Sequence, residues 1–119
     1  MQKNPDLTKA IIEAIQDKKG KKITLIDLSH IESSSASEFI ICQGSSTSQV
    51  SAIADSIREE LLDKLKVKPY NYDGYRNSQW IVIDYGSTLV HVFLPDVREH
   101  YNLEELWSDG KTTEIPDLD

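Results

Sequence analysis

A chain of 119 residues with 39% hydrophobic residues suits one folded domain with a single core. Its 20 acidic and 13 basic side chains give a net charge of −7, which disfavours broad direct binding to DNA or RNA phosphates and is compatible with a basic protein partner. A single cysteine excludes an internal disulfide, and no stretch reads as a signal peptide or membrane span, so we expect a cytoplasmic protein without a membrane partner.

The first part of the chain predicts a short helix followed by two strands. Asn4 can cap this helix, and Gly20 ends it. Strand-forming stretches follow at 23–28 and 38–44, separated by a polar loop.

A longer helix begins after the second strand. Ser46 as N-cap and Gln49 three residues later form a capping-box pattern. Apolar residues then recur at the spacing of one helix face, at Val50, Ile53, Ala54, Ile57, Leu61 and Leu65. Pro69 stops the helix, and residues 69–74 predict a short edge strand.

The stretch 78–95 predicts a β-hairpin whose two-residue turn is 86–87. This register places Trp80 opposite Phe93, and successive side chains alternate between the two faces of the sheet. One face carries the residues expected in the core beneath the long helix: Ile81, Ile83, Tyr85, Thr88, Val90 and Val92. The other face is apolar with two polar groups: Trp80, Val82, Asp84, Leu89, His91 and Phe93.

The C-terminal part predicts one or two short helices, with Asp96 as the first N-cap and Asn102 starting the second. Their apolar side fits either a partner or the sheet edge, and it consists of Tyr101, Leu103, Leu106 and Trp107. Residues 109–119 are polar and acidic and predict a flexible tail after a domain of residues 1–108. The element order indicates a single α/β domain with a mixed sheet of about five strands flanked by helices.

Asp84 and His91 suggest one catalytic hypothesis, because they lie diagonally on one face of the predicted hairpin. An aspartate that orients a histidine can make it a general base. The stretch supplies no nucleophile, however, and polar pairs of this kind are often structural. We therefore favour His91 as a partly buried residue satisfied by Asp84 or by the backbone.

The turn 44–46 lies between a strand and a helix, where helix N-termini favour anions, and it resembles the Gly-Ser signature of nucleotidyltransferases. Those enzymes hold metal ions with closely spaced carboxylates, whereas here Asp55 is followed two positions later by Ile57. The three histidines share no metal-ligand spacing either. We expect no catalytic residues, no metal and no cofactor.

Two long segments carry a family resemblance: "SASEFIICQGSSTSQVSAIADSI" and "GYRNSQWIVIDYGSTLVHVFLPDVREHYNLEELW". Together they resemble the ribosomal silencing factors, also called the Iojap family, over about residues 5–108. The resemblance implies a nucleotidyltransferase-like fold without catalytic carboxylates, and a cytoplasmic protein that is not an enzyme. It further implies homodimers and docking on large-subunit ribosomal protein fourteen, which blocks small-subunit joining and represses translation when nutrients are short. The acidic charge leaves at most a minor contact with ribosomal RNA.

Carried onto this sequence, the resemblance places partner binding on the hairpin and its flanks. The candidate residues are Asp73, Gly74, Trp80, Asp84, Tyr85, His91, Tyr101, Glu104 and Trp107. Trp80 would supply the apolar anchor, and Asp84 and Glu104 would complement a basic ribosomal protein. The family usually has Glu-Gly before the tryptophan strand, so Asp73 keeps the charge, whereas Ser87 stands where an acidic residue is common. The alternative is a residual nucleotidyltransferase or nucleotide-binding enzyme that uses the 44–46 turn.

Overall fold

The computed structural model describes residues 5–118. Its helices are α1 (Pro5–Asp17), α2 (Thr47–Leu65), α3 (Pro95–Tyr101) and α4 (Leu103–Leu106). Its strands are β1 (Lys21–Asp27), β2 (Glu38–Gln43), β3 (Asn71–Asp73), β4 (Trp80–Asp84), β5 (Thr88–Phe93) and β6 (Lys111–Ile115). They form one mixed sheet in the order β3-β4-β5-β2-β1-β6, which confirms the predicted α/β class. The predicted cap at Asn4 lies outside the described residues.

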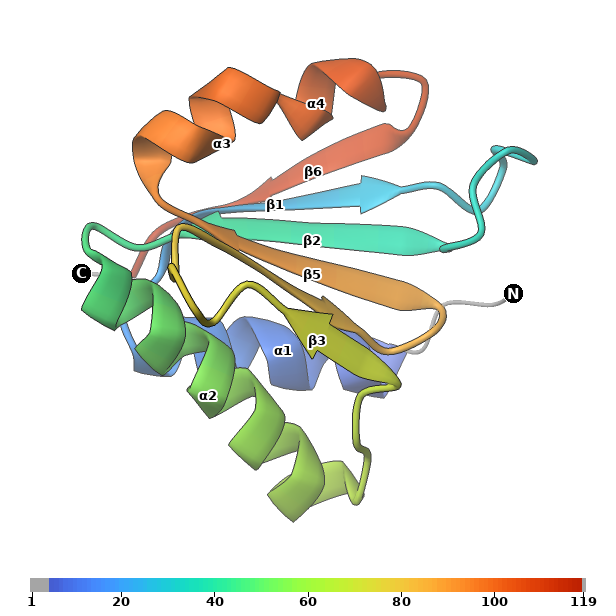
Figure 1. The fold of residues 1–119 in the computed structure, drawn as a ribbon. Coiled ribbons are helices and arrows are strands. Elements are labelled where there is room, and N and C mark those ends of the chain that lie inside the picture. The colour runs from blue at the N-terminus through green and yellow to red at the C-terminus, as the bar shows by residue number, and fades with distance from the viewer. Residues whose placement is uncertain (1–4, 119) are drawn as a thin grey trace.

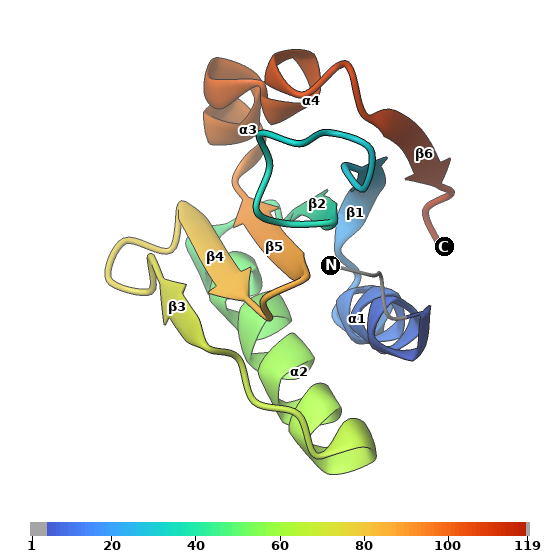
Figure 2. The ribbon, with the colours of Figure 1, turned by 90° about the vertical axis from the view of Figure 1, so that its right-hand side faces the viewer.

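The sheet is covered on both faces, by α1 and α2 on one side and by α3 and α4 on the other (Figures 1 and 2). Strand β2 lies inside the sheet, between β5 and β1, and its side chains serve both faces. Ile40 and Cys42 join the core under α1 and α2, whereas Phe39 and Ile41 join the core under α3 and α4. A strand buried on both faces reads as a continuous apolar run, which explains the sequence "FIIC". Cys42 is a fully buried core residue.

The predicted start of α2 is confirmed in the hydrogen bonds around its first turn. The Gln49 N–H donates to Ser46 Oγ at 3.1 Å, as a capping box requires. The Gln49 side chain departs from that pattern, because its Oε1 accepts from the Ser45 N–H at 2.7 Å. The helix ends at Leu65, and Lys66 follows in a left-handed conformation.

The hairpin register is also confirmed. Trp80 pairs with Phe93 and Val82 pairs with His91. The Tyr85 N–H donates to the Thr88 carbonyl at 2.9 Å, so the turn contains the two residues 86–87. Because side chains alternate along a strand, this turn decides which side chains of β4 and β5 reach each face.

Two expectations for the C-terminal part are wrong. Lys111–Ile115 is strand β6, paired antiparallel with β1, where a flexible tail was expected. The strand satisfies the backbone groups of β1, and Ile115 packs against the core under α1 and α2. Asp96 is not the N-cap of α3: Leu94 occupies that position and Pro95 begins the helix, because its fixed φ suits a first helical turn.

Candidate partner-binding site

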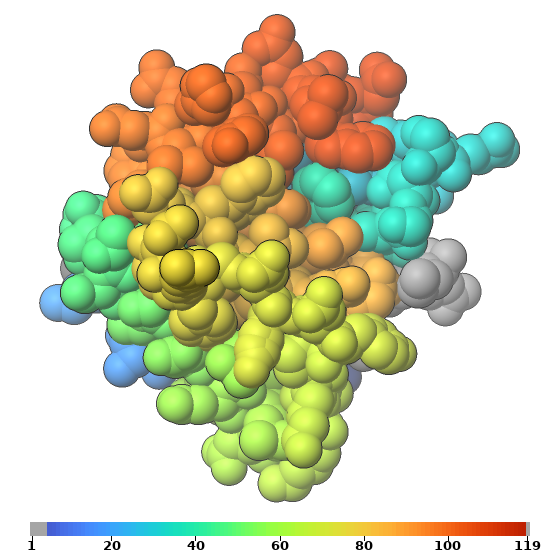
Figure 3. Space-filling view, in the orientation of Figure 1, coloured from blue at the N-terminus to red at the C-terminus, as the bar shows by residue number. Residues whose placement is uncertain are grey.

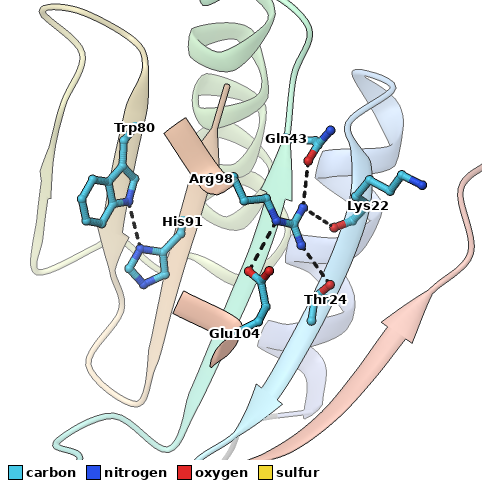
Figure 4. A network of polar contacts seen from close by, with 7 residues as sticks. All are labelled: Lys22, Thr24, Gln43, Trp80, His91, Arg98 and Glu104. Atoms are coloured by element: carbon cyan, nitrogen blue, oxygen red, sulfur yellow. Dashed lines mark hydrogen bonds and ion pairs between the residues drawn. The ribbon is translucent and has the colours of Figure 1, made fainter. Parts of the chain in front are cut away.

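A cluster of aromatic side chains stands on the face of the hairpin that α3 approaches. The Trp80 Nε1–H donates a hydrogen bond to His91 Nδ1 at 3.1 Å (Figure 4). The Trp80 ring stacks on Phe93 with centroids 5.0 Å apart and meets Tyr101 of α3 at 4.7 Å. The hairpin register and the α3 helix together therefore fix the position of the indole.

His91 is the buried part of this cluster, with 6% of its surface exposed and the Phe39 ring 4.8 Å away. Burial lowers the pKa of His91 to about 4, because the charged form is disfavoured away from water. The imidazole is thus neutral near pH 7. Since Nδ1 accepts from Trp80, the ring proton is on Nε2.

The expected contact between Asp84 and His91 is wrong. The Asp84 carboxylate accepts the Gly86 N–H at 2.7 Å and so closes the hairpin turn. His91 instead accepts from Trp80, the residue diagonal to it on the other side. The pair therefore lacks the carboxylate–imidazole bond that the general-base hypothesis required.

A surface groove of about 510 Å³ opens beside Trp80. Its lining combines aromatic and charged groups: Trp80 and Tyr101 stand beside Asp73, Asp96 and Arg76. Figure 3 shows residues 70–80 directly below α3 and α4 on one face of the molecule. The groove thus lies between two segments that are distant in sequence.

Gly74 shapes the wall of this groove. Its φ is +106°, and a Cβ added there would lie 2.1 Å from the carbonyl oxygen of Trp80. Only glycine combines that backbone conformation with so close an approach to β4. The structure therefore gives Gly74 a specific role in bringing residues 71–74 against the tryptophan strand.

The structure brings some of the predicted site residues together and separates others. Asp73, Gly74, Trp80 and Tyr101 line the groove, and His91 lies behind Trp80. Tyr85 lies on the opposite face, buried in the core under α2, where burial raises the pKa of its phenol to about 12. It is therefore not available at this groove.

Trp107 and Glu104 lie on the part of α3–α4 that packs against β1 and β2. Trp107 makes an edge-on contact with Phe39 at 5.7 Å. Glu104 Oε1 lies 3.4 Å from the Nε of Arg98, so its charge is partly used within the chain. Of the predicted amphipathic stretch, Leu103 is buried, whereas Tyr101 and Leu106 are 51% and 70% exposed.

Arg98 is the residue beside the groove that the sequence reasoning missed. Its side chain is almost buried and donates to the Lys22 carbonyl at 2.7 Å, Thr24 Oγ1 at 3.0 Å and Gln43 Oε1 at 3.2 Å (Figure 4). These bonds tie α3 to β1 and β2. A sequence signal was present, because the arginine opens the "REHYNLEELW" segment that carried the family resemblance.

The 44–46 turn is accounted for by helix capping and by the neighbouring loop. Ser46 Oγ and the Ser45 N–H bond to Gln49, whose Nε2 donates to the carbonyls of Lys18 and Lys19 at 3.1 Å each. Within residues 5–118, no three His, Cys, Asp or Glu side chains are grouped to hold a metal ion. In the same part of the chain, no helix is both long and apolar enough to cross a membrane. A small pocket beside the 44–46 turn is lined by Gly44, Ser45, Lys19 and Lys21, so the nucleotide-binding alternative stays a prediction.

Fold and site together define an α/β domain whose groove is lined by aromatic and charged residues. The family model described as "Ribosomal silencing factor during starvation" matches residues 1–119. A ribosomal silencing factor of Halalkalibacterium halodurans is 36% identical over 113 residues, covering 94% of this chain and 94% of the relative. A crystal structure of a protein from Chromobacterium violaceum superimposes with a TM-score of 0.83 at 34% identity, covering 90% of this chain and 88% of that one. The chain belongs to the ribosomal silencing factor family.

More distant relatives come from organelles. The chloroplastic protein Iojap of Zea mays is 37% identical over 78 residues, which cover 66% of this chain and 33% of that protein. A protein of Mus musculus is named "Mitochondrial assembly of ribosomal large subunit protein 1" and is 34% identical over 73 residues, covering 59% of this chain. These matches confirm the resemblance to the Iojap proteins.

Proposed function

We propose that this chain represses translation when nutrients are short by binding the large ribosomal subunit. It docks on ribosomal protein fourteen and prevents the small subunit from joining, without acting as an enzyme. Family membership supports this function, and the name of the mouse relative associates that protein with the large subunit. The single observation that carries the proposal is the groove in which Trp80 and Tyr101 stand beside Asp73 and Asp96.

The chemistry of the groove suits a basic protein surface. Tyr101 is half exposed and, with Trp80, offers rigid apolar area of the kind that dominates binding energy at interfaces. Asp73 and Asp96 outnumber Arg76 in the lining of the groove, and the net charge of the whole chain is −7. Ribosomal proteins are typically basic because they contact RNA, so the charges speed association and orient the complex.

The mechanism is steric exclusion. The folded chain extends 35 × 34 × 29 Å, so on the surface where the subunits meet it occupies space that the small subunit needs. No covalent bond is made or broken. We also propose that the protein acts in the cytoplasm and forms homodimers when it is not bound to the ribosome.

Substituting Tyr101 tests the docking surface. Tyr101→Ala removes exposed aromatic area from the groove, and we expect it to weaken binding to purified large subunits about tenfold or more. Tyr70→Ala is the matched control, since Tyr70 is 84% exposed and does not line the groove. Binding is measured by co-sedimentation across a concentration series. Equal affinities for the two variants would show that the groove is not the docking surface.

A further inference from the structure

The turn between α1 and β1 concentrates positive charge in an acidic chain. Residues 18–22 read Lys-Lys-Gly-Lys-Lys and so contain four of the 13 basic residues. Lys18, Lys19 and Lys22 are exposed, and none of them forms an ion pair within residues 5–118. The Lys21 Nζ donates to the Leu118 carbonyl at 2.9 Å. These three ammonium groups therefore have no ion-pair partner among the described residues.

This turn is held in place, unlike an ordinary solvated run of charges. Gly20 is buried where a Cβ would meet Ile15 Cγ2 at 2.5 Å and Ile53 Cδ1 at 3.2 Å. The two carbonyls before it accept from Gln49 Nε2, and the Lys22 N–H donates to Asp117 Oδ1 at 2.8 Å. A backbone fixed in this way presents its lysines with little further ordering on binding.

The lysine turn and the aromatic groove lie at the same end of the sheet. Lys21, near the start of β1, pairs with Gln43 at the end of β2, which pairs with Phe93 at the end of β5. Trp80 at the start of β4 pairs with the same Phe93. Lys21 and Trp80 are therefore three strand spacings apart across the sheet, which at about 4.8 Å each gives about 14 Å. Figure 1 shows the end of α1 and the starts of α2 and α3 gathered there.

We propose that residues 18–22 bind backbone phosphates of ribosomal RNA beside the protein that occupies the groove. This inference rests on the proposed function. Lysines recognise phosphates as point charges without reading bases, which suits a contact that positions the protein rather than selecting a sequence. A protein bound to a ribosomal protein has ribosomal RNA as its nearest dense polyanion. The net charge alone predicted at most a minor RNA contact, because it sums the acidic residues of the whole chain with this basic turn.

The test compares two triple variants that change the net charge equally. Lys18→Gln, Lys19→Gln and Lys22→Gln remove the exposed lysines of the turn. The control removes three exposed lysines elsewhere, with Lys66→Gln, Lys68→Gln and Lys111→Gln. Affinity for purified large subunits is measured over a series of salt concentrations. We expect the turn variant to bind about tenfold more weakly at about 0.1 M salt, with the slope of log affinity against log salt reduced by about two, and the control to match the parent.

Further outcomes separate this inference from the proposed function. Replacing the same three lysines by arginine keeps the charge and should restore binding and the salt slope. If the turn variant and the control behave alike while the parent binds, the inference is wrong and the proposed function stands. If the parent protein itself does not bind large subunits, the proposed function is wrong. Carbodiimide cross-links from the turn lysines to carboxylates of a ribosomal protein would show that the lysines contact an acidic protein and not RNA. That result would overturn the proposal.

Discussion

At the scale of single residues, the bond between Trp80 and His91 matters most for the site. The indole N–H is used inside the protein, so Trp80 offers a partner its apolar ring and not a hydrogen-bond donor. His91 can accept that bond only while Nδ1 is unprotonated. Burial, which keeps the imidazole neutral, therefore also keeps the indole in position.

Substituting His91 changes how stability depends on pH. The pKa of His91 is lowered from 6.5 to about 4 in the folded protein, so between these values the unfolded state binds a proton that the folded state does not. The contribution of His91 is therefore complete above pH 6.5 and is lost as pH falls toward 4, at about 1.4 kcal/mol per pH unit. Urea unfolding across this range should show a weaker pH dependence for His91→Gln than for the parent.

Glutamine is the chosen replacement because its Oε1 can accept the indole N–H without titrating. His100→Gln is the control, because it removes an exposed histidine and leaves His91 in place. Parallel stability curves for the parent and His91→Gln would contradict the assignment of a neutral, buried imidazole.

Gly74→Ala tests the wall of the groove. The added Cβ would meet backbone atoms of Trp80 and Ile81 at 2.1 and 3.0 Å, in a residue whose φ is +106°. Backbone cannot yield as a flexible side chain does, so we expect the unfolding free energy to fall by about 2–4 kcal/mol. Asn77→Ala, at an exposed position of the adjacent turn, should change it by less than about 0.5 kcal/mol. Thermal or urea unfolding of both variants measures these changes. A Gly74→Ala protein with the unfolding free energy of the parent would refute this packing.

At the scale of elements, Arg98 joins α3 to the sheet. Its guanidinium bonds the Lys22 carbonyl and Thr24 Oγ1 and pairs with Glu104. A planar group with donors in fixed directions can satisfy all of these at once, whereas an ammonium cannot. Since Tyr101 is on the same helix, Arg98 also positions one side of the groove.

Arg98→Lys should therefore destabilise the protein although it keeps the charge. We expect a loss of about 2–3 kcal/mol in unfolding free energy, because buried acceptors lose their donors. Arg76→Lys, in an exposed turn, is the matched control and should be nearly neutral. A double-mutant cycle with Glu104→Gln measures the coupling, and additive losses would mean that Arg98 and Glu104 do not act together.

The same elements show what the sequence could predict. The register of β4 and β5 follows from a local turn and from the alternation of side chains between the two faces of a sheet. It could therefore be predicted residue by residue. Strand β6 was missed because "KTTEI" has almost no apolar pattern and exists through pairing with β1, about 90 residues earlier in the chain. The Trp80–His91 bond was missed for another reason: the register put Trp80 and Asp84 on either side of His91, and only packing chose between them.

At the scale of the whole molecule, charge is divided between two neighbouring regions. The groove carries two aspartates, Asp73 and Asp96, and one arginine, Arg76, whereas the turn 18–22 carries exposed lysines and no carboxylate. A ribosomal surface made of a basic protein and RNA carries positive charge that complements the aspartates and negative charge that complements the lysines. Net charge, a single sum over the chain, did not reveal this division, and only the strand order places the two regions at one end of the sheet.

Association of purified ribosomal subunits, followed by light scattering, tests the central claim most directly. With the chain in excess over large subunits, we predict that added small subunits form few complete ribosomes, whereas Tyr101→Ala permits association. If subunits associate fully while the parent chain remains bound to the large subunit, steric exclusion is contradicted.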